Sequence, residues 1–219
     1  MLPRFALPAI LLGTLLFASP AQAVPVYFTI DHCALGNCSA FDSSGRGGIL
    51  ASLDVINGND LLITLTNALN MDADGDDPHL THLGFQYGSL LEGLTFDSFE
   101  VLSGTVARPT FSVDSTIRAF TIDFGFAFPD SPNRSDWFQA ANPHESVQMV
   151  VGTTGDVDLN QFLLGIAKIG GAGANGLSGS ITLTGTPSQT HSIPEPGSLA
   201  LVGLGMATFW ARRSRAPRA

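Results

Sequence analysis

The sequence predicts an all-β fold for residues 24–190, an antiparallel β-sandwich with one short helix. Apolar and polar residues alternate over several short segments, which is typical of strands with one buried face. Turns rich in Gly, Pro and Asn separate these segments, and the chain contains 24 Gly and 13 Pro in 219 residues. Short strands at such spacing, with turns of this composition, favour a β-sandwich.

The first predicted strand is Val26–Ile30, and a hairpin follows it. Two alternating runs lie on either side of the turn residues Asn57-Gly58-Asn59-Asp60. An Asn-Gly pair between two such runs predicts a β-hairpin. The apolar residues are Ala51, Leu53 and Val55 in the first run and Leu61, Ile63 and Leu65 in the second.

The clearest strand ends at Pro129. Five large apolar residues alternate there with smaller or polar ones, so we expect all five on one face, packed into a core. They are Phe120, Ile122, Phe124, Phe126 and Phe128. The same alternation predicts strands at residues 83–87, 96–102, 147–151 and 181–183.

One segment has a helical pattern instead. Asp158 as N-cap and Gln161 three residues later match a capping box. Apolar residues follow at helical spacing until Gly170-Gly171, namely Leu159, Phe162, Leu163 and Ile166. The pattern predicts a short helix that packs on an edge or end of the sandwich.

Residues 1–23 have the pattern of a secretory signal peptide. Arg4 supplies positive charge, residues 5–17 are apolar, and Ala21-Gln22-Ala23 is a small-residue cleavage site. A buried N-terminal helix is the alternative, but Pro3, Pro8 and Pro20 would interrupt it. We expect cleavage after Ala23 and export.

The tail, residues 191–219, has three parts in a fixed order. Pro194-Glu195-Pro196 is expected to be extended, because proline fixes φ and cannot continue a helix or a ladder. Residues 197–211 are apolar and are predicted to enter the membrane; as a helix they span roughly 22 Å, short for a hydrocarbon core of about 30 Å. Arg212, Arg213 and two further arginines follow, and clustered arginines stay on the cytoplasmic side.

This three-part tail resembles the PEP-CTERM sorting signal of envelope proteins in Gram-negative bacteria. The resemblance implies processing by an exosortase, with an intermediate tethered to the inner membrane and delivery to the cell surface or extracellular matrix. A permanent anchor through the same transmembrane segment is the alternative. Cleavage near Pro194-Glu195-Pro196 is a hypothesis; a mature protein that still carries Phe209 and Trp210, seen by mass spectrometry, would refute it.

Charge excludes one class of partner. Residues 24–190 keep five of the ten Lys and Arg residues and eighteen of the nineteen Asp and Glu residues, a formal charge of −13. Such a surface repels nucleic acid and other anionic polymers unless cations bridge them. We therefore expect no nucleic-acid binding.

Cys33 and Cys38 are the only cysteines, and an exported chain meets an oxidising compartment. We favour a disulfide between them, which would restrict the unfolded chain by about 2 kcal/mol. A metal site with the adjacent His32 is the alternative, but no second cysteine pair is present to complete it.

The best candidate metal site is an acidic segment. Its oxygen ligands have the spacing of an EF-hand-type calcium loop, with Gly75 at the sharp turn. They are Asn70, Asp72, Asp74 and Asp76. Thr81 occupies the position of the usual bidentate glutamate, so a solvated acidic turn is the alternative. Asp156, Asp158 and Asn160 offer a second, poorer set of oxygens.

His79 and His82 lie three residues apart beside the acidic segment. This spacing is not specific for zinc outside a helix, and a zinc site would need further ligands placed by the fold. A surface or hydrogen-bonded histidine pair is favoured.

The sequence contains none of the common enzyme motifs. It has no Gly-x-Ser-x-Gly, no phosphate-binding glycine loop and no His-Glu-x-x-His. We therefore expect a non-catalytic protein of the cell envelope or extracellular matrix, with a structural or adhesive role. The alternative is a calcium-assisted module that binds extracellular polysaccharide, with Trp137 as the exposed contact.

Overall fold

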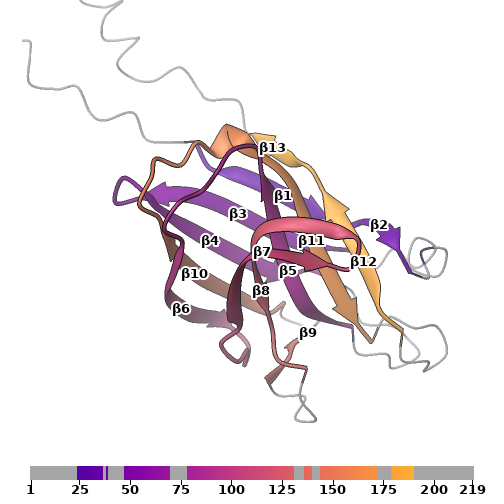
Figure 1. Cartoon of the computed structure of the whole chain (residues 1–219). Helices are drawn as coiled ribbons and strands as arrows, with labels where there is room; N and C mark the ends of the chain where they lie inside the picture. The colour runs from indigo at the N-terminus through magenta and orange to yellow at the C-terminus, as the bar shows by residue number, and fades with distance from the viewer. Residues whose placement is uncertain are drawn as a thin grey trace, which may run out of the picture. The chain divides into compact units, whose positions relative to one another are not determined.

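Two antiparallel sheets pack face to face and bury a shared core (Figure 1). The computed structural model of the chain describes residues 24–36, 38, 47–69, 78–130, 136–139, 144–171 and 179–189. These residues belong to one compact unit, residues 23–190. The predicted signal peptide, residues 1–23, and the tail, residues 191–219, lie outside the described residues.

Among the described residues, sheet A has six strands and sheet B has seven. In spatial order, sheet A consists of β13 (Pro187–Gln189), β1 (Val26–Ile30), β3 (Ile49–Ile56), β4 (Asp60–Asn67), β10 (Ser146–Gly152) and β6 (Thr95–Ser103). Sheet B consists of β2 (His32–Leu35), β12 (Ile181–Gly185), β11 (Phe162–Gly170), β5 (His79–Tyr87), β8 (Phe120–Ala127) and β7 (Thr110–Ile117), while β9 (Phe138–Gln139) pairs with the start of β5. The predicted β-sandwich is confirmed.

The Asn-Gly hairpin has the predicted form. β3 pairs with β4 from Ile49↔Asn67 to Ile56↔Asp60. Asn57 and Gly58 both have positive φ, 53° and 95°, which Asn and Gly tolerate better than other residues. Alternate residues of both strands point into the core, so the turn also sets which side chains are buried.

Aromatic rings fill the centre of the core. The Phe85 ring of sheet B lies 5.4 Å from the Phe28 ring of sheet A, in an edge-to-face arrangement. Phe124 and Phe162 surround Phe85 at centroid distances of 5.5 and 6.1 Å. These contacts hold the two sheets together at the centre of the sandwich.

The predicted helix after Asp158 is wrong. Only Leu159–Gln161 form a 3-10 turn, which Asp158 caps by accepting a hydrogen bond from the Asn160 N–H. From Phe162 the chain continues as strand β11, which pairs with β5 on one side and β12 on the other. A short apolar run suits a buried helix and a central strand equally well, and here pairing on both edges decides for the strand.

The predicted alternation of β8 is also only partly correct. Phe124, Phe126 and Phe128 pack in the core between the sheets, but Ile122 packs with Ile117 and Ile166 in a second cluster, against which Phe120 lies. That cluster lies on the outer face of sheet B. Leu83 and Phe85 point into the core, so a side chain at Gly84 between them would point outward. A Cβ at Gly84 would lie 2.7 Å from Ile122, which places Ile122 on that outer face.

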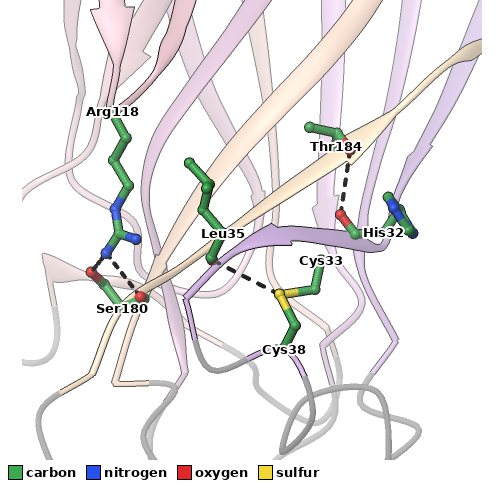
Figure 2. Close-up of a disulfide and its surroundings, with 7 residues drawn as sticks. All are labelled: His32, Cys33, Leu35, Cys38, Arg118, Ser180 and Thr184. Atoms are coloured by element: carbon green, nitrogen blue, oxygen red, sulfur yellow. Dashed lines mark hydrogen bonds between the residues drawn. A yellow bond between two sulfur atoms is a disulfide. The ribbon is translucent and has the colours of Figure 1, made fainter.

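Loss of the ladder explains the change of face. Pairing of β8 with β5 ends at Phe124. At the neighbouring residue, Asp123, the side-chain carboxylate instead accepts a hydrogen bond from the Tyr87 N–H at 2.7 Å. Beyond that point the β7–β8 hairpin covers the outer face of sheet B. Arg118 at its tip donates two hydrogen bonds to Ser180, next to β12 (Figure 2).

The predicted disulfide between Cys33 and Cys38 is confirmed. It links β2, the edge strand of sheet B, to the residues that follow it (Figure 2). Cys33 is packed in the core and β2 pairs with β12, so the bond adds a further constraint on this edge strand.

Removal of this disulfide should destabilise the protein. We expect the Cys33→Ala/Cys38→Ala double variant to lose about 2 kcal/mol of unfolding free energy, because the unfolded chain gains loop entropy. Urea denaturation followed by circular dichroism measures the loss. Wild-type protein treated with a reductant is the matched comparison, and equal stability of the oxidised protein and the double variant would contradict the expectation.

Candidate functional site

Several segments that carry the predicted site residues meet at one end of the sandwich, which we call the loop end. β4 ends there at Asn67, and β5 begins there at His79. Asn70, Asp72, Asp74 and Asp76 themselves lie outside the described residues. β9 pairs with the start of β5, which brings Trp137 to the same end.

His79 and Trp137 form an aromatic pair at the loop end. Their ring centroids are 3.9 Å apart and their planes differ by 21°, so the rings stack. The His79 side chain is buried, and its Nε2 lies 3.2 Å from Oδ1 of Asp130, a carboxylate that is mostly exposed. Trp137 is partly buried, because one face of its indole lies on the imidazole.

The position of His79 requires a glycine on the neighbouring strand. A Cβ on Gly170 would lie 2.7 Å from His79 Nε2. Gly170 pairs with His79 at the end of β11, so the absence of a side chain there makes room for the buried ring. The sequence pattern showed Gly170 only as a helix end.

A β-bulge brings His82 to the same face as His79. Lys168 pairs with His82 and Ile169 pairs with Leu80, so Thr81 is an extra residue in β5. Two residues three apart would normally point to opposite faces of a strand; the bulge puts both imidazoles on the outer face of sheet B, near Lys168.

Hydrogen bonds assign the tautomer of His82. The Thr81 hydroxyl donates to the Lys168 carbonyl oxygen at 2.9 Å, so its oxygen is left to accept. His82 Nδ1 lies 3.1 Å from that oxygen, which makes Nδ1 the protonated nitrogen. The pKa of His82 is lowered, first by burial and then by the Lys168 charge; the Asp130 carboxylate opposes this to a smaller extent.

Stability should therefore depend on pH through His82. Because the folded state disfavours the protonated imidazole, stability is greatest above the unfolded pKa of about 6.5 and decreases as the pH falls through the folded pKa. We expect His82→Gln to lose this part of the pH dependence, as measured by urea denaturation at about pH 7.5 and 5.5. His144→Gln, at an exposed histidine, is the control; identical pH dependence in wild type and His82→Gln would contradict the assignment.

Buried polar residues that the sequence did not single out hold this end together. The Glu145 carboxylate accepts hydrogen bonds from the Gln139 N–H at 2.6 Å and the Thr105 N–H at 3.2 Å. The Asn67 amide donates to the Phe138 carbonyl oxygen at 2.9 Å. Glu145 and Asn67 thus fix β9, and with it the residues next to Trp137.

Two residues of the second set of oxygens, Asp158 and Asn160, are bonded to each other. Asp158 Oδ1 accepts hydrogen bonds from the backbone and side-chain nitrogens of Asn160, at 3.0 and 2.7 Å. These bonds lower the pKa of Asp158. Among the described residues, no group of three or more His, Cys, Asp and Glu side chains is placed to hold a metal ion.

The loop end therefore offers an aromatic surface beside charged and polar groups. Trp137, stacked on the buried His79, supplies the aromatic surface, and Asp130, His82 and Lys168 supply one carboxylate, one imidazole and one ammonium group. Such a set can bind a polar ligand by stacking and hydrogen bonding.

Comparison with known proteins identifies the tail. Residues 192–216 match the family model of the PEP-CTERM protein-sorting motif, which includes Pro194, Glu195, Pro196, Arg212 and Arg213. The motif indicates processing by an exosortase and export through that pathway, with a membrane-anchored intermediate. No curated protein and no solved structure matches the chain. Within the described ranges, no helix is long and apolar enough to cross a membrane.

Proposed function

We propose that this chain, which ends in a PEP-CTERM protein-sorting motif, is a non-catalytic structural or adhesive protein of the cell surface or extracellular matrix. The observation that carries the proposal is the position of the motif, directly after a β-sandwich. The β-sandwich domain is exported through the sorting pathway, and it acts by surface contacts rather than through an active site.

The exposed face of sheet A supports this role. Strand register places one polar side chain from each of six neighbouring strands in a single row. The row consists of Ser188, Tyr27, Ser52, Thr64, Gln148 and Glu100. Neighbouring strands lie about 4.8 Å apart, so the row is a regular array of hydrogen-bonding groups suited to contact with a polymer.

Sorting can be tested by fractionating the native host. We expect wild-type protein at the surface or in the matrix, and protein with Pro194, Glu195 and Pro196 changed to alanine in the inner membrane. A host without its exosortase should give the same shift for the wild-type protein. Equal distribution of both proteins, or wild-type protein in the cytoplasm, would refute the proposal.

A second candidate function is calcium-assisted binding of extracellular polysaccharide at the loop end. The stacked Trp137–His79 pair favours it, because β5 begins at His79 and the Asn67 amide at the end of β4 donates a hydrogen bond to Phe138, next to Trp137. Calorimetry should then give a dissociation constant for calcium of roughly 0.1–1 mM that is lost in Asp72→Asn/Asp74→Asn. No heat on addition of calcium, and no change in melting temperature, would exclude it.

A further inference from the structure

A groove lies where the chain crosses from sheet B to sheet A, between β12 and β13. Its volume is about 400 Å³. Polar residues from both sheets line it, namely Thr29, Asp31, His32, Thr184, Thr186 and Ser188. Trp137 and His79 do not line it, so the groove is distinct from the loop end.

The groove is built by a close contact between two backbones. A Cβ on Gly185 would lie 2.2 Å from the Thr29 carbonyl oxygen, so only glycine lets β12 approach β1 this closely. Thr184 donates a hydrogen bond to the His32 carbonyl oxygen at 3.4 Å, and the disulfide at Cys33 holds the same strand (Figure 2). One wall is therefore fixed before any ligand arrives, which lowers the entropy cost of binding.

The lining has the chemistry of a sugar site. It offers four hydroxyl groups, one carboxylate and one imidazole, with the apolar side chain of Leu164 beside them and no lysine or arginine. Hydroxyls and carboxylates exchange hydrogen bonds with sugar hydroxyls, and apolar side chains contact the sugar C–H groups. An anionic ligand would be repelled by Asp31 and by the charge of −13 over residues 24–190.

Tyr27 adds an aromatic ring next to the groove. It pairs with Ser188 and lies two residues before Thr29, so all three side chains project from the same face. Its exposed fraction of 42% is high for a tyrosine in the middle of a strand. An exposed tyrosine combines an apolar ring face with a polar hydroxyl, which suits contact with a sugar ring.

We propose that this groove, with Tyr27 at its side, binds a segment of a neutral polysaccharide. The polar row on sheet A begins at Ser188 and Tyr27, so a chain that leaves the groove meets further hydrogen-bonding side chains on the outer face. The inference rests on the proposed function, which places the protein among extracellular polymers.

Affinity electrophoresis of the full chain in detergent tests the groove. The gels contain a soluble neutral β-glucan, a dextran, a galactomannan or, as the anionic comparison, alginate. We expect at least one neutral polymer to retard the protein and alginate to have no effect. Tyr27→Ala should raise the dissociation constant at least about 10-fold. Tyr27→Phe keeps the ring, so its dissociation constant should stay within about 3-fold of the wild-type value.

Three controls locate the binding site. Leu102→Ala removes a similarly exposed side chain from β6, at the far edge of the same sheet, and should bind as wild type does. Trp137→Ala and addition of EDTA should also leave binding unchanged, because Trp137 lies at the loop end and the proposed contacts in the groove require no metal ion. Circular dichroism checks that Tyr27→Ala is folded, and Asp31→Ala is a second variant expected to weaken binding.

Two outcomes would overturn the inference. One is the absence of retardation by every neutral polymer; the other is undiminished binding by both Tyr27→Ala and Asp31→Ala. Loss of binding in Trp137→Ala alone would also overturn it, in favour of the loop end. Host fractionation separates this failure from failure of the proposed function: protein that reaches the matrix but binds no neutral polymer refutes only the groove.

Discussion

Replacement of Phe85 by alanine is expected to lower the free energy of unfolding by about 3–5 kcal/mol, far more than a typical surface substitution. Phe85 is fully buried, two residues before the end of β5, and contacts Phe28 across the sheet interface. Its removal costs transfer free energy and leaves a cavity, because rings anchored on different strands cannot collapse into the space.

Two further variants show whether the loss of stability in Phe85→Ala comes from the lost buried volume. Phe85→Leu keeps most of the buried volume and should lose less than half as much stability as Phe85→Ala. Leu90→Ala, at a side chain that is 78% exposed, should change stability by no more than about 0.5 kcal/mol. Urea denaturation gives all three values. A loss below about 1 kcal/mol in Phe85→Ala would mean that the aromatic core does not join the sheets as described.

Alternation allowed most of the sandwich to be predicted from the sequence. Val26–Ile30 and the Asn-Gly hairpin were predicted because buried and exposed residues alternate there and the turn residues fix the register. Strand β7 was not predicted: it is an edge strand with mostly exposed residues, although Phe111 and Ile117 pack against buried clusters. β11 was mistaken for a helix because a central strand is apolar on both faces and loses the alternating pattern.

The site depends on contacts that local pattern does not contain. The disulfide was predictable because its two cysteines are close in sequence and no others compete. The stacking of His79 on Trp137 depends on pairing between β5 and β9, and the common face of His79 and His82 depends on one extra residue at Thr81. The groove combines residues from the two ends of the domain, β1 and β13, which only the topology brings together.

Replacement of Glu145 by leucine is expected to cost about 2–4 kcal/mol of unfolding free energy. The Glu145 carboxylate is buried and accepts hydrogen bonds from the backbone of Thr105 and of Gln139. A hydrogen bond to a charged acceptor contributes about 1.5–3 kcal/mol, and the Thr105 N–H can recover part of this by binding water. Leucine fills the space but accepts neither bond, so the loss reflects the hydrogen bonds rather than a cavity.

Glu145→Gln distinguishes the role of the carboxylate from that of volume. Glutamine keeps one carbonyl oxygen but places an NH₂ group against the second backbone N–H. We therefore expect Glu145→Gln to be less stable than wild type but more stable than Glu145→Leu. Glu92→Leu, at an exposed glutamate, should stay within about 0.5 kcal/mol of wild type. Because Gln139 belongs to β9, Glu145→Leu should also shift the fluorescence of Trp137, two residues away. Unchanged stability together with unchanged fluorescence would show that the loop end does not depend on Glu145, and that contacts such as the Asn67 hydrogen bond, pairing with β5 and the packing of Phe138 on Phe128 hold β9.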